Sequence, residues 1–289
     1  MAQTKIRSGQ LDALSYICDG RLSLESGVPV SISDQTSASI VRFIPYKGDY
    51  IGLYNGVKWE VSTFAETELD ISGISGSTIC DIFGYDNSGT FTLTSGSWTN
   101  TTTRDVAITT QDGVYVRTGE TDKRYLGTIY VNDNGVCQDT TSLRYVWNYY
   151  NRVVRNLFCQ DTTDSWAYTT ATVREANNNT TAGVGRFELV IGVAEDIVSF
   201  VNINSTRTTA DADAIGGIGI DSTSVNSHQI GGCIIRTATV PLIAKYEDYI
   251  AVGYHYIQRT EYSGAAGTTT WLGDGSGDKL TGMMGRVMG

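Results

Sequence analysis

Alternation of apolar and polar residues is the dominant pattern of this chain, and it is clearest between Ile40 and Glu66. From Tyr50 onward, large apolar side chains alternate with small or polar ones, which is the periodicity of a β-strand. The run breaks at Asn55-Gly56, a dipeptide that tolerates positive φ at both centres of a tight turn, and it resumes through Trp59. The pattern therefore predicts a β-hairpin.

Short segments of the same kind recur along the rest of the chain, separated by turn signals such as Asp112-Gly113 and Asn134-Gly135. In the first half we expect strands within 21–33, 69–71, 79–85, 90–93, 106–108, 114–116 and 125–131. In the second half we expect them within 166–173, 187–193, 197–203, 215–220, 233–243 and 249–258, with 197–203 pairing to 187–193. Strands at this spacing predict an all-β fold of antiparallel sandwiches or barrels.

One segment departs from the alternation. Between Leu143 and Phe158 the apolar residues recur at the three- and four-residue spacing of a helical stripe. Thr141 or Ser142 could cap the helix at its start. The segment predicts a short helix between two halves.

These patterns divide the chain into four parts. Residues 1–20 form an N-terminal docking arm, and residues 21–140 form a first antiparallel β-sandwich. Residues 141–160 form a helical linker, and residues 161–289 form a second, jelly-roll-like β-sandwich. The predicted fold is thus two antiparallel sandwiches joined by a short helix.

Composition narrows the classes of partner. The formal net charge is −10, which disfavours binding to nucleic acid and to anionic membranes because both require clustered cations. The first residues lack the apolar stretch of a signal peptide, and no run approaches the length of a membrane span. We therefore expect no nucleic acid and no membrane insertion.

Candidates for catalysis and for cofactor binding are few. The sequence has two histidines, His228 and His255, and neither lies in a zinc-protease motif. The sequence also lacks the G-x-S-x-G elbow of a serine hydrolase. The five cysteines are widely spaced and form no metal-binding or disulfide pattern: Cys18, Cys80, Cys137, Cys159 and Cys233. We expect a non-enzymatic protein with no cofactor and no metal.

Carboxylates leave glycosidase chemistry open, since it needs only two acidic groups a few ångströms apart. The densest small clusters are Asp211 with Asp213 and Asp274 with Asp278, and solvated loops or an incidental cation site are the favoured interpretations of both. Trp271 is the tryptophan most expected to be exposed. Together with Asp274, Asp211 and Asp213 it forms the candidate contact for a host glycan.

The other aromatic residues are expected to anchor the core or a subunit interface. The candidates are Tyr46, Tyr50, Trp59, Phe64, Trp147 and Tyr150.

Several of these segments resemble a family of tailed-bacteriophage virion proteins, which serve as tail-fibre, head-fibre or decoration components. The most specific part is the order PY-x-G-x-x-I-x-LY-x-G-x-x-W, which begins at Pro45 and ends at Trp59. Similar stretches include DIFGYDNSG, RYLGTIYV, YVWNYYNRV and GYHYIQRTEYSGAAGTTTWLGDGSG, so the resemblance spans roughly residues 20–289. It implies a particle component without catalytic residues, made in the bacterial cytoplasm and assembled as an oligomer, commonly a homotrimer.

The resulting expectation is a fibre-like or spike-like virion protein. Its first sandwich attaches to the capsid, neck or tail, and its second sandwich projects and could contact a host cell-surface glycan. The alternative is a capsid decoration protein that stabilises the head. A glycan hydrolase of the virion is a remote third.

Overall fold

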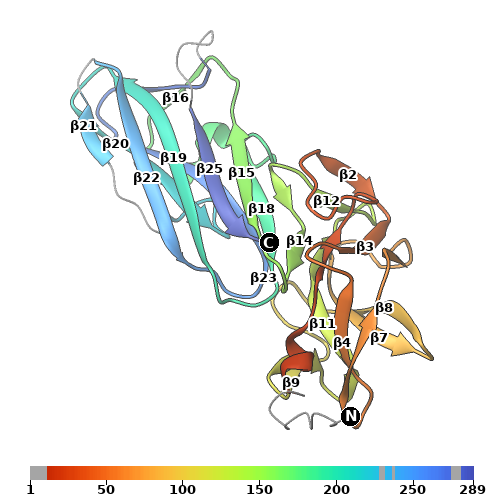
Figure 1. The fold of residues 1–289 in the computed structure, drawn as a ribbon. Helices are drawn as coiled ribbons and strands as arrows, with labels where there is room; N and C mark the ends of the chain where they lie inside the picture. The colour runs from red at the N-terminus through yellow and green to blue at the C-terminus, as the bar shows by residue number, and fades with distance from the viewer. Residues whose placement is uncertain (1–11, 228–231, 236–237, 275–280) are drawn as a thin grey trace, which may run out of the picture.

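The computed structural model describes residues 12–227, 232–235, 238–274 and 281–289, and these residues are almost entirely β (Figure 1). Their helical segments are two 3-10 turns, η1 (Asp12–Tyr16) and η2 (Ala176–Asn178). The all-β prediction is confirmed. Most of the predicted docking arm, residues 1–11, lies outside the described residues.

The first half, lower right in Figure 1, combines three groups of strands. The small sheets contain β1 (Gly20–Ser23), β3 (Ile40–Pro45) and β6 (Thr67–Asp70), and separately β4 (Tyr50–Tyr54) and β5 (Trp59–Thr63). The third group begins the large sheet with β2 (Gln35–Ala38), β7 (Thr78–Asn87), β8 (Thr90–Ser97), β9 (Ile108–Gln111), β10 (Val114–Arg117), β11 (Glu120–Val131), β12 (Cys137–Asp139), β13 (Leu143–Arg144) and β14 (Val146–Asn148).

The predicted hairpin is present as β4 and β5, whose last pair is Tyr54 with Trp59. Its loop is longer than the two-residue turn that Asn-Gly favours. Asn55 donates its amide to the Lys58 carbonyl at 3.1 Å, and its side-chain oxygen accepts the amides of Val57 and Lys58 at 3.0 Å. Gly56 takes a φ of +91° within this loop.

The second half, upper left in Figure 1, is built from two facing sheets. One continues the large sheet with β17 (Arg174–Glu175), β18 (Arg186–Ile191), β20 (Ala212–Ile220), β21 (Gly232–Ile235) and β23 (Gly253–Ser263). The other is a six-stranded sheet of β15 (Val154–Gln160), β16 (Ser165–Tyr168), β19 (Ile197–Thr208), β22 (Val240–Tyr249), β24 (Thr269–Leu272) and β25 (Gly282–Met288). Phe187 and Phe200 pack across the gap between these sheets, with their ring centroids 5.3 Å apart.

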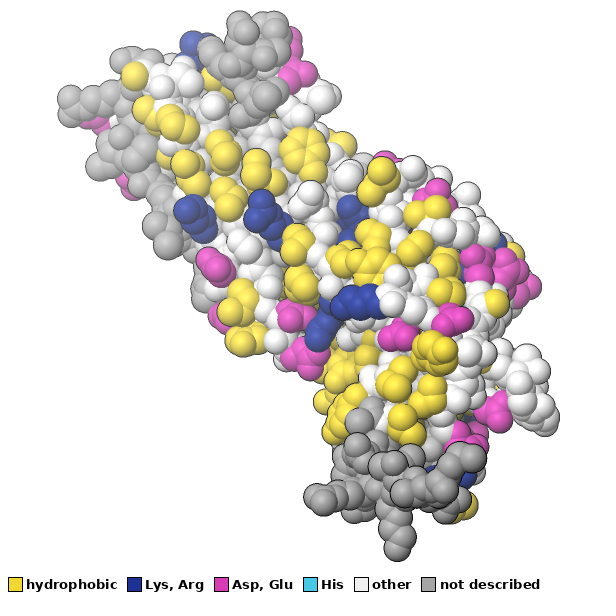
Figure 2. Space-filling view, viewed as in Figure 1, with side chains coloured by type: hydrophobic (Ala, Val, Ile, Leu, Met, Phe, Trp, Pro, Cys, Tyr) yellow, Lys and Arg dark blue, Asp and Glu magenta, His cyan; other side chains and the backbone are white. Residues whose placement is uncertain are grey.

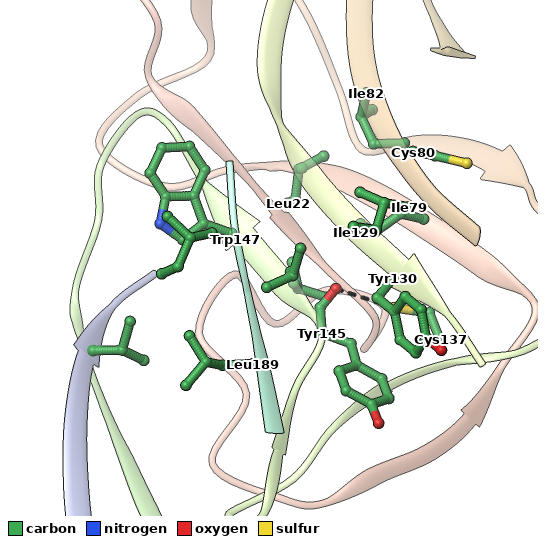
Figure 3. Packing of buried hydrophobic residues seen from close by; sticks show 14 of the residues in the cluster. Leu22, Ile79, Cys80, Ile82, Ile129, Tyr130, Cys137, Tyr145, Trp147 and Leu189 are labelled. Atoms are coloured by element: carbon green, nitrogen blue, oxygen red, sulfur yellow. Dashed lines mark hydrogen bonds between the residues drawn. The ribbon is translucent and has the colours of Figure 1, made fainter. Parts of the chain in front are cut away.

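The two halves share one sheet and one apolar core. β13 pairs with β12 on one side and, in parallel, with β18 on the other, so the large sheet passes from one half into the other. Buried residues of both halves form one cluster, part of which Figure 3 shows around Trp147, Ile129 and Leu189. A partly buried ion pair also spans the junction. Arg104 binds Asp81 at 2.6 Å and donates to the carbonyl of Gly192 at 2.7 Å.

The helix predicted between Leu143 and Phe158 is wrong. The segment forms β13, β14 and β15, and its backbone amides bond to distant partners, as Tyr149 does to Leu126 and Phe158 to Thr141. Asn151 takes a φ of +52°, which a helix does not accommodate. The three- and four-residue spacing of apolar side chains favours a helix, but the β-branched and aromatic residues of this segment also suit strands. Hydrogen bonding to other strands therefore decides its structure.

The pairing predicted between 187–193 and 197–203 is also wrong. These residues form β18 and β19, which lie in different sheets: β18 pairs with β23 and β13, and β19 pairs with β22, β24 and β25. The chain crosses from one layer of the second half to the other between the two strands.

Candidate functional site

The outward face of the six-stranded sheet carries an unusual share of exposed apolar side chains. Alternate residues of a strand point to opposite faces, so each strand contributes every second residue to this surface. Half of the exposed large hydrophobic side chains among the described residues lie here: Val154, Phe158, Ile197, Ile243, Tyr249 and Met284. We call this surface, with the half-exposed Val201 and Ile203 between them, the outer face.

Two hollows interrupt the outer face. The larger has a volume of about 470 Å³ and lies between β15, β19 and β25, with Leu157, Val201 and Arg286 among its lining residues. The smaller, about 150 Å³, lies beside Ile203 and Gln160. Phe158 and Met284 line both hollows. Figure 2 shows many hydrophobic side chains close together on this surface of the second half, with a few cationic side chains among them.

The inward face of the same sheet is partly polar. On β19, Asn202, Asn204 and Thr206 are fully buried between the two sheets. Arg259 of β23, also fully buried, donates to the side-chain oxygens of Asn202 at 3.2 Å and of Asn204 at 3.1 Å. Burial lowers the pKa of the Arg259 guanidinium, because an apolar surrounding disfavours its charged form.

The second part of β19, from Val201 onward, therefore reverses the usual arrangement of a sheet that has one face in water. The first inward residues of β19, Val198 and Phe200, are apolar, but its next inward residues are Asn202 and Asn204, while Val201 and Ile203 point outward. An outward apolar row is a liability for a monomer and is typical of a surface that another molecule covers. The outer face is accordingly the best candidate for an interaction surface.

Cations are set into the apolar surface. Lys245 and Arg286 are exposed on it, and no carboxylate of the described residues lies within 4.0 Å of either. Glu247 is an exposed acid on the same strand as Lys245. A partner that is apolar and locally acidic would match this arrangement.

Of the predicted glycan contacts, Trp271 is not exposed. Its relative exposure is 0%, and it packs beside Tyr168, Ala214 and Leu242 in a small cluster inside the second half. The prediction of an exposed Trp271 was wrong because β24 lies between β19 and β16, where alternate residues face the interior.

The acidic candidates do not gather around Trp271. Asp211 and Asp213 are exposed, and Asp274 is half-buried. The register of β24 on β19 pairs Thr269 with Thr208 and Leu272 with Ser205. Asp211 comes after the end of β19, which lies beside the first residue of β24, whereas Asp274 comes after the last residue of β24. The strand β24 therefore separates these two carboxylates, and they do not form a pair.

The six aromatic candidates for core or interface lie in different environments. Phe64 and Trp147 are in the core, and Tyr150 packs partly buried against it, with the Arg124 guanidinium 4.5 Å from its ring centroid. Trp59 is half-buried and donates its indole N–H to Asp112 at 3.0 Å. Tyr46 and Tyr50 are exposed at 39% and 50%.

Groups capable of metal or nucleophilic chemistry are not clustered in the described residues. No set of three histidine, cysteine or acidic side chains there could hold a metal ion. Four cysteines are buried free thiols, and burial raises the pKa of Cys18 and Cys80 to about 11. His255 is buried, with its ring nitrogens 2.7 Å from Asp221 and 2.8 Å from the Ala251 carbonyl. Among the described residues, no helix is long and apolar enough to cross a membrane.

Comparison with known proteins places the chain in no family. No family model matches it, and no curated protein does either. Among solved structures, it is similar to the Eiger TNF of S. frugiperda, with a TM-score of 0.27 and 8% identity over 47% of this chain and 92% of the other. It is also similar to the δ-endotoxin Cry8Ea1 of Bacillus thuringiensis, with a TM-score of 0.26 and 10% identity over 97% of this chain and 55% of the other.

The outer face is not evident from the sequence pattern. Both faces of the strand Ile197–Thr208 carry apolar side chains at alternate positions. The pattern alone therefore does not say which face meets the core. Buried asparagines at alternate positions opposite outward Val201 and Ile203 are the signal, and it becomes readable once the facing Arg259 is placed.

Proposed function

We propose that the protein is a non-enzymatic structural component of a tailed-bacteriophage particle, fibre-like or spike-like, that works as an oligomer of identical chains. The outer face is the surface through which copies associate, three copies being the number that the sequence resemblance implies. We also propose that each half of the chain is one antiparallel β-sandwich and that the second has a jelly-roll-like topology.

The reversed polarity of β19 carries this proposal. In the middle of β19, the asparagines are buried against an arginine while Val201 and Ile203 face outward. An outward apolar row of this kind is expected where a partner also buries the outward face. Phe158 and Met284, which are 45% and 49% exposed, extend this apolar surface across β15 and β25.

A second copy of the chain is the occupant that the charges favour. The outer face presents Lys245 and Arg286, whereas the chain as a whole carries a formal net charge of −10, so each copy offers acidic surface elsewhere. Contact between different patches of identical chains closes into a ring when the rotation between copies permits it, and a rotation of a third of a turn gives a trimer without another partner.

The particle itself tests the proposed function. We expect quantitative mass spectrometry of purified particles from the encoding phage to detect this chain, and particles lacking its gene to lose that signal alone. A handful of copies supports a tail or neck fibre, while hundreds of copies support the alternative of capsid decoration. Absence of the chain from purified, infectious particles would overturn both.

A further inference from the structure

The loop between β1 and β2, residues 24–34, carries an apolar tip on the first half of the chain. Ile32 is 98% exposed, the largest exposed fraction of any large hydrophobic side chain among the described residues. Val28, Pro29 and Val30 come shortly before it and are half-exposed. The fold of the single chain gives Ile32 almost no contact, and neighbouring exposed apolar residues of this kind mark a surface that another molecule covers.

Hydrogen bonds within the chain hold this loop. The Ser31 hydroxyl lies 2.5 Å from a carboxylate oxygen of Glu25, and Gln35 donates its side-chain amide to the same oxygen at 3.4 Å. Nearer the start of the loop, Gly27 donates its backbone amide to Glu66 at 2.7 Å. A loop held in this way loses little conformational freedom when a partner covers it, so it suits a binding contact.

Acidic side chains flank the apolar tip. Glu25 and Asp34 stand on either side of it in the sequence, and no cation of the described residues lies within 4.0 Å of either carboxylate. Arg42 lines the same hollow as Asp34, but it is already paired with Glu66 and Glu68. The loop therefore presents uncompensated negative charge beside its apolar side chains.

The larger hollow of the outer face complements this tip in shape and in charge. Its volume of about 470 Å³ exceeds that of an isoleucine side chain. Its apolar lining residues are Leu157, Phe158, Val201 and Met284. Arg286 also lines it and has no carboxylate of the described residues within 4.0 Å. Asp34 accepts the backbone amide of Thr141 with one oxygen, at 3.2 Å, and its other oxygen could accept from a guanidinium.

The next most exposed hydrophobic side chain of the described residues fits the hollow less well. Val57, in the loop of the β4–β5 hairpin, is 84% exposed. It stands beside Lys58, whose ammonium is paired with Glu60 at 2.8 Å. A cation at this position would face the cations Lys245 and Arg286 of the outer face, which opposes binding there.

We infer that the β1–β2 loop of one copy binds the larger hollow in the outer face of another copy, with Ile32 in the hollow and Asp34 against Arg286. This contact rests on the proposed self-association and specifies its second surface. Because two different patches of the chain meet, the copies associate head to tail, and a rotation of a third of a turn between them closes a trimer.

The change Ile32→Glu tests this contact, since it would bury an unpaired charge in the apolar hollow. By light scattering at tens of micromolar, we expect the wild type at a multiple of 31.3 kDa and Ile32→Glu at 31.3 kDa. Val57→Glu is the matched control, an exposed aliphatic residue changed to the same acid, and it should keep the wild-type mass. Both variants should keep the wild-type circular dichroism spectrum, because neither side chain is buried in the single chain.

A mixture of variants tests the head-to-tail arrangement. Ile32→Glu keeps an intact outer face, and the double variant Phe158→Glu with Met284→Glu keeps an intact β1–β2 loop. Each should be monomeric alone, whereas an equimolar mixture of the two should form a dimer of twice 31.3 kDa through the one intact contact. An interface in which the same patch meets itself would leave the mixture at 31.3 kDa.

Two results would overturn the role of the loop while leaving self-association through the outer face in place. Ile32→Glu has the mass of an oligomeric wild type, or the mixture stays at 31.3 kDa while the wild type is oligomeric. A wild type that is itself monomeric would instead refute the proposed self-association, and the contact with it.

Discussion

Along the middle of β19, the two faces of the six-stranded sheet differ in the opposite sense from most sheets with one face in water, whereas the rest of its inward face is mostly apolar. Inward, Asn202 and Asn204 meet a buried arginine, and outward, Phe158 and Met284 stand in solvent. The side-chain oxygens of these two asparagines accept hydrogen bonds from Arg259 within the chain. The apolar exterior has no stabilising partner within the described chain. A strand that turns apolar side chains outward and polar ones inward indicates that its outward face is buried in an assembly.

The largest expected effect separates two phenylalanines of this sheet. Phe200 is fully buried between the layers, so Phe200→Ala should lower the free energy of unfolding by about 3–5 kcal/mol. Phe158→Ala on the outer face should leave monomer stability within about 1 kcal/mol but weaken self-association about tenfold or more. Urea unfolding measures the free energy of unfolding, and sedimentation measures self-association, with all variants at the same protein concentration. Equal loss of stability in both variants would contradict the contrast.

A second comparison concerns neighbouring residues on β19. Asn204→Val removes an acceptor from the buried Arg259 guanidinium, which should cost about 2 kcal/mol of unfolding free energy. Ser205→Val, one residue further and outward, is the control and should change stability by less than about 0.5 kcal/mol. Urea midpoints of both variants give the answer. The polar interior would be dispensable if Asn204→Val proved neutral or stabilising.

A smaller effect should appear at alkaline pH. Burial raises the pKa of Cys159, on the inward side of β15, from 9.0 to about 12. Because the unfolded chain loses this proton first, the contribution is full below pH 9 and is lost as pH rises toward 12, by about 1.4 kcal/mol per unit at most. Unfolding free energies at pH 8 and 10 should therefore fall less steeply in Cys159→Ala. Phe158→Cys, on the outer face, should add no slope, and an unchanged slope in Cys159→Ala would contradict the burial of this thiol.

The smallest effect concerns the cations of the outer face. Lys245→Gln and Arg286→Gln should each change the dissociation constant of the oligomer only a few-fold, because exposed ion pairs contribute roughly 0.2–1 kcal/mol. Both should make association less sensitive to salt. Sedimentation at 50 and 500 mM NaCl is the measurement. Unchanged salt sensitivity would remove charge complementarity as an argument for a second copy.

Much of the fold was predictable from local patterns. The all-β class, the hairpin of β4 and β5 and most strands follow from alternation and turn residues, which act over a few positions. The errors concern long-range pairing. The segment from Leu143 to Phe158 is extended because β14 and β15 pair with β11 and β25, and β19 lies in a different sheet from β18.

The candidate site was less predictable for a related reason. Trp271 stands in a Gly-rich stretch that suggests an exposed loop, yet pairing of β24 with β16 and β19 buries it. The outer face depends on which side of each strand meets the other layer, and a one-residue shift of register would exchange the two sides. Only the facing sheet, with Arg259, decides it.

The mass of the purified full chain in solution tests self-association through the outer face most directly. Light scattering at tens of micromolar should give a multiple of 31.3 kDa, three copies by the proposal, and Phe158→Glu with Met284→Glu should give 31.3 kDa with an unchanged circular dichroism spectrum. These charges would have to be buried unpaired in the oligomer, which costs several kcal/mol. A wild type that stays at 31.3 kDa, or a double variant that keeps the wild-type mass, would contradict the account.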